Sequence, residues 1–282
     1  MEHAAPSNAQ RGRTLTWHEA TDWQRNSKYI LRGYRTPKAD CREILTSLTF
    51  LHNETCNVYT HLIGAILLPV IAALIMRGFL YSQFFFASGM DYAMFGIFFW
   101  CTECCLLLST AFHLLASRSR EVVNFWCRMD LVSIVIFTMG SIVPGIYYIY
   151  FCESYWRRIH WVVAITSGFS TSALLSLPVF STILWRRIRI GAFVVLGASA
   201  LIPLIHGSHR YGLNGSTIHL LQIPERFAPG RFDIWGSSHQ IFHVAILCAI
   251  AVHTVGLIQA FTACHTMDIC SIQAAQKADQ RA

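Results

Sequence analysis

Six long apolar segments constrain the fold of this chain more than any other feature. Each reaches or approaches the length of ~20 residues that a helix needs to cross the hydrocarbon of a bilayer. Only 13% of the 282 residues are charged, against about 25% in an ordinary soluble domain. The sequence therefore predicts an all-α fold, a polytopic membrane helix bundle. The six segments cover approximately residues 57–76, 92–116, 129–151, 161–183, 189–206 and 239–263.

The polar residues around these segments predict the orientation of the chain. The first 30 residues contain no apolar core of the kind that a secretory signal peptide needs, so we expect a cytosolic N-terminus. Arg118 and Arg120 follow the second segment and three arginines at 186–189 follow the fourth, which favours a cytosolic position for both loops. Arg157 and Arg158 follow the third segment and argue the other way.

Three parts are expected along the chain. They are a cytosolic N-terminal segment over residues 1–56, a transmembrane helical domain over 57–264 and a polar tail over 265–282. The formal charge is +7, but the arginines cluster at the edges of apolar segments, so we expect no nucleic-acid partner. We expect a multi-pass protein of the plasma membrane or an endomembrane. Most of the ten cysteines are interpreted as small buried apolar side chains.

His239 and His243 stand four residues apart at the start of the last apolar segment. This spacing places both rings on one face of a helix, where two imidazoles can bind one metal ion. The same pair is also typical of interfacial histidines that hydrogen-bond to their neighbours. The spacing by itself leaves both interpretations open.

A serine, a histidine and an aspartate are expected to converge at the cytosolic side of the membrane. Ser109 and His113 fall on adjacent turns of one helical face, and Asp130 lies near the start of the next apolar segment. Polar side chains in hydrocarbon are costly without partners, so this convergence favours a functional site. Glu103, inside the second segment, admits both a functional role and a structural role as a hydrogen-bonded carboxyl group.

Several long and unusual strings stand out in the sequence, namely ILRGYRTP (30–37), LTFLHNETCNVYTHLIGA (48–65), Ser109-x-x-x-His113, Asp130 and PERFAPGRFDIWGSSHQIFHV (224–244). They resemble the PAQR family, the progestin and adiponectin-type receptors that group with the haemolysin III-like proteins. The resemblance implies a seven-helix membrane bundle with a zinc ion at its cytosolic side. It implies His113, His239 and His243 as the zinc ligands, with Asp130 holding a water on the metal and Ser109 near it. For LHNETCN we expect only capping of the first membrane helix and packing beside it.

The resemblance extends to alkaline ceramidases and so implies hydrolysis of a lipid amide such as ceramide. Three histidines with an open fourth position are also typical of catalytic zinc. The expected partners are therefore a membrane lipid of the ceramide type and, for a receptor, an extracellular protein ligand. Two alternatives stay open. One is a non-catalytic receptor, or a metal- or lipid-homeostasis protein, with structural zinc, and the other is a transporter or pore, suggested by Glu103.

The chain departs from the family pattern before the last apolar segment. After Pro203 the family supplies about 20 further apolar residues, whereas LIHGSHRYGLNGSTIHLLQI is too polar and too short for an ordinary span. We therefore expect a seven-span architecture with a shortened or missing sixth span. Either the segment returns through the bundle interior as an irregular stretch, or His239 lies ~30 Å from His113, across the hydrocarbon. The polarity of HRYGLNGST favours the second outcome, a form that cannot assemble the zinc site.

Overall fold

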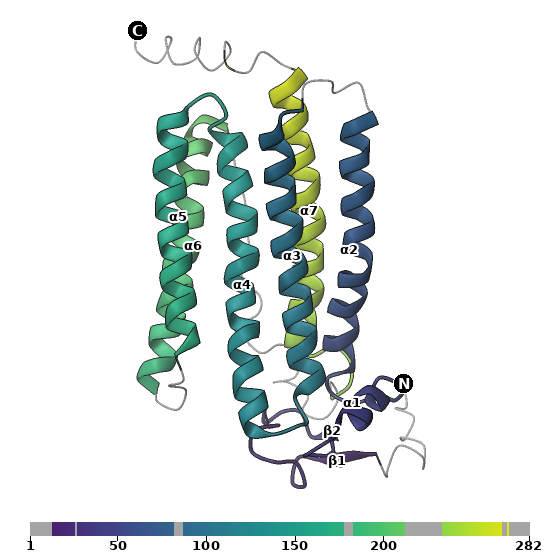
Figure 1. Ribbon diagram of the computed structural model, residues 1–282. Coiled ribbons are helices and arrows are strands. Elements are labelled where there is room, and N and C mark those ends of the chain that lie inside the picture. Colours follow the sequence, from purple (N-terminus) through teal and green to yellow (C-terminus); the bar gives the residue numbers. More distant parts are fainter. Residues whose placement is uncertain are drawn as a thin grey trace. The chain divides into compact units, whose positions relative to one another are not determined.

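The computed structural model describes residues 13–25, 27–81, 87–177, 183–211, 233–266 and 270 (Figure 1). Helices dominate these residues, as the composition predicts. The only strands among the described residues form one small sheet near the N-terminal end, which the sequence analysis did not foresee. The elements are β1 (Thr14–Thr16), β2 (Arg32–Arg35), α1 (Cys41–Ser47), α2 (Thr55–Tyr81), α3 (Gly89–Leu115), α4 (Arg120–Ile149), α5 (Ser154–Ser176), α6 (Ile183–Tyr211) and α7 (Ser238–Thr266).

The six longest helices, α2 to α7, correspond to the six predicted apolar segments. Within the described residues, five of them are long and apolar enough to cross a membrane, namely α2, α3, α4, α5 and α7. The helix α6 is 29 residues long and carries three arginines near its start. The fold is therefore a polytopic membrane bundle. Most of the stretch in which the sixth span was expected to be shortened lies outside the described residues.

Close contacts divide the chain into two compact units. The first unit comprises residues 1–65, 106–130 and 216–248, and the second comprises 66–105, 131–215 and 249–282. The first unit therefore holds the N-terminal strands, α1, the starts of α2, α4 and α7, and the end of α3.

Local hydrogen bonds account for the start of the first unit. β1 pairs with β2 in antiparallel register, with Thr14 opposite Arg35 and Leu15 opposite Tyr34. Helix α1 begins with a capping box in which the Asp40 side chain accepts from the Glu43 main-chain N–H at 2.8 Å, while the Glu43 carboxylate accepts from the Asp40 N–H at 2.9 Å. Such a box satisfies two amides that a helix start otherwise leaves without partners.

Two glycines allow helices of the second unit to pack closely. A Cβ atom at Gly140 would lie 2.3 Å from the Cβ of Cys101, and one at Gly168 would lie 2.6 Å from the sulfur of Met139. Small residues at such crossings let membrane helices approach, because lipid supplies no hydrophobic force between them. Cys101 is a free thiol in this contact, as expected for a packing cysteine.

A disulfide joins Cys152, before α5, to Cys270, after α7. The interpretation of most cysteines as buried apolar side chains is wrong, because among the free cysteines only Cys105 is buried, whereas Cys41 and Cys248 are exposed. Arg157 lies in the same unit and donates hydrogen bonds to the carbonyl oxygens of Tyr150 and Phe151 at 3.3 and 2.9 Å. Its guanidinium also lies over the Tyr147 ring, 5.4 Å from the centroid. These contacts give the arginine a local structural role.

Candidate metal centre

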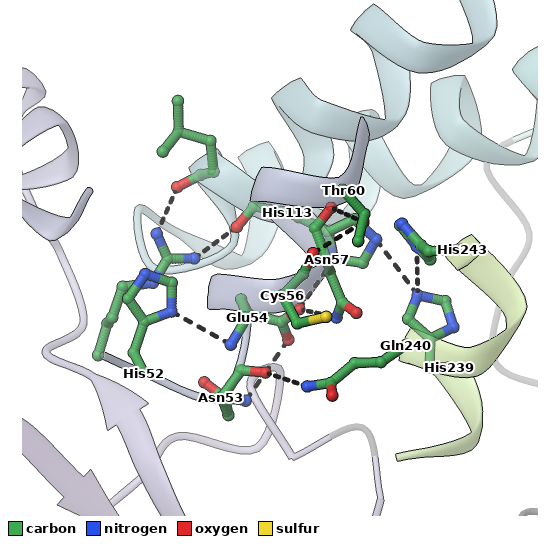
Figure 2. Close-up of polar contacts among 12 residues, drawn as sticks. His52, Asn53, Glu54, Cys56, Asn57, Thr60, His113, His239, Gln240 and His243 are labelled. Atoms are coloured by element: carbon green, nitrogen blue, oxygen red, sulfur yellow. Dashed lines mark hydrogen bonds and ion pairs between the residues drawn. The ribbon is translucent and has the colours of Figure 1, made fainter. Parts of the chain in front are cut away.

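Three histidine rings converge within the first unit (Figure 2). His113 comes from the last turn of α3, and His239 and His243 come from the first two turns of α7. His239 Nε2 lies 3.2 Å from His113 Nε2 and 3.2 Å from His243 Nε2. One ligand atom from each ring lies within 4.8 Å of the others, and His113 and His243 are each only 2% exposed.

This spacing fits a tetrahedral zinc site. Zinc binds imidazole nitrogen at about 2.0–2.1 Å, so two ligands of a tetrahedron lie about 3.3–3.4 Å apart. The two nitrogen–nitrogen distances of 3.2 Å that involve His239 agree with that value, and the ligand atoms of His113 and His243 lie within 4.8 Å of each other. Among the described residues, no fourth histidine, cysteine or carboxylate belongs to the group.

The expectation that His239 would lie across the hydrocarbon from His113 is wrong. It rested on counting membrane crossings through a polar segment, and the measured distance between the two Nε2 atoms is 3.2 Å. The histidine cluster is therefore assembled, although residues 212–232 lie outside the described part of the chain.

Glu54 supports the cluster from the residue before α2. Its Oε2 lies 2.8 Å from His113 Nδ1, and the same oxygen accepts a hydrogen bond from the Asn57 amide at 2.6 Å. Burial by itself would raise the pKa of Glu54, but the hydrogen bond and charge of His113 and the Asn57 amide outweigh it and hold that pKa well below its ordinary value. An ionised carboxylate on Nδ1 fixes the tautomer that directs the Nε2 lone pair at a metal.

His52 shapes the turn that presents Glu54. The Nδ1 atom of its ring accepts a hydrogen bond from the Glu54 main-chain N–H at 3.1 Å, and the His52 main-chain N–H donates to Thr55 Oγ1 at 2.8 Å. Burial and the nearby Arg35 lower the pKa of His52 to about 3, so the ring is neutral and its nitrogen can accept. The string LHNETCN therefore forms a hydrogen-bonded turn before α2, and it also supplies the carboxylate next to His113, which the sequence analysis did not predict.

His61 packs directly against the cluster. Its ring stacks on His243 with centroids 3.9 Å apart, and it is 1% exposed. The sequence analysis assigned no role in the site to His61, although this residue lies within the string LTFLHNETCNVYTHLIGA. The signal in the sequence was the position of His61 two helical turns after Glu54. That position indicates that its ring lies near the carboxylate of the site.

Ser109 and Asp130 lie beside the histidines, as the sequence predicts. Ser109 is buried one turn before His113, and its side chain is hydrogen-bonded to the Asp130 carboxylate. Asp130 is half-buried and lies within electrostatic range of His113 and Glu54. The site therefore combines three imidazoles, a carboxylate behind them and a second carboxylate held by a serine.

Glu103, which the sequence analysis singled out, does not belong to the histidine group, and neither do Cys104 and His253. Glu103 belongs to the second unit, and its buried Oε2 has no hydrogen-bond partner among the described residues. Cys104 is a free thiol near Glu103 in the chain. His253 lies further along α7, with its ring 5.0 Å from that of Phe98.

Known proteins resemble this chain over most of its length. The haemolysin-III related family profile matches residues 49–254. The chain is 30% identical over 273 residues to the ADIPOR-like receptor IZH2 of Saccharomyces cerevisiae, an alignment that covers 90% of this chain and 86% of the yeast protein. It is 32% identical over 256 residues to the adiponectin receptor protein of Drosophila melanogaster, covering 83% of this chain but only 56% of the fly receptor.

A human relative has similar coverage. Progestin and adipoQ receptor family member 3 of Homo sapiens is 28% identical over 256 residues, covering 82% of this chain and 81% of the human protein. The matched region contains the start of α2, the end of α3 and the start of α7, which together carry the histidine cluster. The chain thus belongs to the haemolysin-III related family, together with the progestin and adipoQ receptors, and is a multi-pass membrane protein of this receptor family.

Proposed function

We propose that this protein is a zinc-dependent hydrolase of lipid amides such as ceramide, with its site at the cytosolic side of the membrane. The observation that carries the proposal is the spacing of the three imidazole nitrogens, together with the lack of a fourth ligand in the group among the described residues. Three protein ligands leave a position for water or substrate, whereas structural zinc sites have four protein ligands.

The chain's own residues suit each part of this chemistry. Zinc, when bound, would lower the pKa of a coordinated water to about 7 and polarise a carbonyl oxygen. His113, His239 and His243 would hold the ion, and the Glu54 carboxylate, 2.8 Å from His113 Nδ1, would keep the proton on that nitrogen.

Asp130 would act as the general base. Its carboxylate would accept a proton from the attacking water and pass it to the leaving nitrogen, while the Ser109 hydroxyl fixes its orientation. In the balanced reaction the acyl carbon–nitrogen bond breaks and a carbon–oxygen bond to water forms. One water proton goes to the amine, and the products are a fatty acid and an amine.

Two features support a cytosolic position for the site. Arg118 lies between α3 and α4 and Arg120 is the first residue of α4, both in the same unit as the histidines, and short basic loops are typical of the cytosolic side. The Cys152–Cys270 disulfide follows the C-terminal end of α7, whereas His239 lies in the first turn of that helix. Disulfides persist in oxidising compartments, so the disulfide end favours the outer side.

The expected substrate is an amphiphile that reaches the site from the bilayer. α2 and α7 both carry large exposed apolar side chains on the membrane-spanning part, including Leu74 at 64% and Val252 at 73% exposure. A helix bundle with such a surface suits a lipid whose amide lies near the membrane boundary. Because relatives carry the name receptor, we propose that the hydrolysed lipid is the signalling output, with an extracellular protein as the ligand.

The test is release of fatty acid from ceramide by the purified protein in detergent or vesicles. We expect hydrolysis in the metal-loaded protein, loss of it with a strong chelator, and recovery on adding zinc. The Asp130→Asn variant is the matched control, since it should keep the metal and lose turnover. Protein that contains stoichiometric zinc but releases no fatty acid from any lipid amide would overturn the hydrolase.

The receptor names of the relatives favour a second candidate, a non-catalytic receptor with structural zinc. In that protein Asp130 would be the fourth zinc ligand and no open position would remain. Cobalt substitution distinguishes the two, because exchange of water at an open position changes the visible spectrum on adding azide. An unchanged spectrum would favour the structural site.

A further inference from the structure

The strand β2 and the residue before it contact all three chain segments that build the histidine cluster. These contacts occur at alternate residues, Leu31, Gly33 and Arg35. We call the segment Thr14–Arg35, which contains β1 and β2, the N-terminal hairpin. The partners of Leu31, Gly33 and Arg35 in these contacts lie in the first unit.

Arg35 holds the end of α3, where His113 lies. Its Nη1 donates to the carbonyl oxygen of Leu114 at 2.8 Å, and its Nη2 donates to the carbonyl oxygen of His113. The last carbonyl oxygens of a helix have no hydrogen-bond partners within the helix, and they carry the partial negative charge of the helix dipole. A cationic donor at that end supplies the missing hydrogen bonds and is attracted by the charge. Arg35 is only 4% exposed. Burial lowers its pKa to about 10, which leaves it charged at neutral pH.

Further hydrogen bonds fix Arg35 itself. Nη1 also donates to the Ser47 hydroxyl at 3.1 Å, and the Gln24 side chain donates to the Arg35 carbonyl oxygen at 2.7 Å. Gln24 lies in the loop of the hairpin, and Ser47 ends α1. The guanidinium therefore links the hairpin and α1 to the backbone of a histidine in the cluster.

Leu31 binds the segment that precedes α7. Its main-chain N–H donates to Asp233 Oδ1 at 2.9 Å, and the main chain of Arg32 bonds the same carboxylate. Asp233 is 6% exposed and precedes α7, which begins at Ser238 and carries His239. This contact fixes the chain just before the second group of histidines.

Gly33 binds the segment that precedes α2. Its carbonyl oxygen accepts from the Asn53 N–H at 2.8 Å, one residue before Glu54. Its φ of +89° is strained for any other residue, and a Cβ atom there would lie 2.8 Å from the end of the Ile234 side chain and 3.1 Å from the main-chain nitrogen of Asn53. Only glycine takes this conformation without strain. Leu31 and β2 therefore contact both the residues just before α2 and the residues just before α7.

We propose that the N-terminal hairpin sets the separation of the segments that carry the histidines, with Arg35 and Asp233 as positioning residues for the metal. The inference rests on the proposed zinc site and adds a consequence to it. Because the hairpin docks on the arrangement that binds the ion, docking and metal binding stabilise each other, and such coupling is reciprocal. Releasing the hairpin lowers zinc affinity, and zinc protects the hairpin from proteolysis.

The test measures zinc affinity by chelator competition in the full-length protein. Arg35→Gln and Asp233→Asn should each weaken zinc binding by roughly 10- to 100-fold, the effect seen when support outside the ligands is lost. Arg42→Gln is the matched control, because Arg42 is an exposed arginine of α1 in the same unit and does not act on Asp233. Arg35→Lys should recover part of the affinity, since it keeps the charge and loses the forked geometry.

Two measurements distinguish a positioning role of Arg35 at the metal site from a general loss of folding. The visible spectrum of the cobalt-substituted protein should shift in Arg35→Lys, which reports ligand geometry and not folding. Zinc should also slow tryptic cleavage after the exposed Lys28 in the unmutated protein and not in Arg35→Gln. If Arg35→Gln aggregates, Arg35→Lys and Asp233→Asn decide the outcome.

A different result would contradict each of the three proposals, namely the hairpin, the metal site and the hydrolase. Unchanged affinity and unchanged cobalt spectra in the Arg35 and Asp233 variants would overturn the hairpin proposal and leave the metal site standing. Unmutated protein that binds no zinc would overturn both proposals. Zinc-bound protein without hydrolysis would overturn the hydrolase alone.

Discussion

Glu54 Oε2 lies 2.8 Å from Nδ1 of His113, so a carboxylate before α2 holds a histidine at the end of α3 (Figure 2). We predict that Glu54→Gln weakens zinc binding by roughly 10- to 100-fold without removing a ligand, because a neutral amide fixes the His113 tautomer less strongly. Chelator competition measures this change. Glu43→Gln is a suitable control, because Glu43 is an exposed residue of the α1 capping box. Equal zinc affinity in the Glu54 variant and the unmutated protein would remove Glu54 from the site.

Asp130 is predicted to serve turnover and not metal binding. Asp130→Asn should retain zinc while ceramide hydrolysis falls by a factor of about 10² to 10⁴, the usual contribution of a general base. Metal content and fatty-acid release are measured on the same preparation. Loss of zinc in this variant would show that Asp130 is a ligand and would support the structural-zinc receptor.

Gly33 is predicted to be intolerant of a side chain. Gly33→Ala places a methyl group against Ile234 and Asn53 at a positive φ, which should cost about 1–3 kcal/mol. Thermal unfolding of the purified protein measures the loss. Gly78→Ala provides the comparison, because a Cβ there meets nothing within 4 Å. Similar melting temperatures for the two variants would contradict the packing at Gly33.

The orientation of the chain is predicted from its cysteines. Cys41 is exposed in α1, in the unit that holds the histidine cluster, whereas Cys152 and Cys270 form the disulfide beyond the other end of α7. In intact cells a membrane-impermeant maleimide should label Cys152 only after reduction and should label Cys41 only after permeabilisation. Variants in which only Cys41, or only the disulfide pair, is retained make the assignment clear. Labelling of Cys41 from outside would reverse the orientation.

Removal of the disulfide should destabilise the second unit. Cys152 and Cys270 are 118 residues apart, and closing a loop of that size typically stabilises a protein by about 2–4 kcal/mol. A Cys152→Ser, Cys270→Ser double variant should therefore melt at a lower temperature than the unmutated protein under oxidising conditions. The two proteins should melt alike after full reduction. A difference that persists after reduction would mean that the serines, and not the missing bond, cause the loss.

The sequence predicts the helices well because membrane spans are set by length and apolarity. All six apolar segments are helices, although α4 begins at Arg120, before the apolar residues themselves start. A polar helix start carries no hydropathy signal, so its boundary could not be found in this way. The N-terminal hairpin was missed because β1 and β2 are only three and four residues long and are separated by a long loop.

The candidate site was predictable only in part. Resemblance to the family indicated His113, His239 and His243, and the structure brings these three together. Glu54 was missed because its partner is 59 residues away, and no spacing within one helix reports such a contact. The predicted separation of His239 from His113 failed for a related reason. Counting apolar spans treats each crossing as an ordinary lipid-facing helix and does not report which residues meet inside the protein.

The most direct test of the account is the zinc content of the purified protein, measured by elemental analysis. We predict about one zinc ion per chain, and loss of it in the His239→Ala, His243→Ala double variant, because a single remaining imidazole cannot hold the ion. His253→Ala, further along the same helix, should keep the metal. Zinc that is absent from the unmutated protein, or undiminished in the double variant, would contradict the histidine cluster as a metal site.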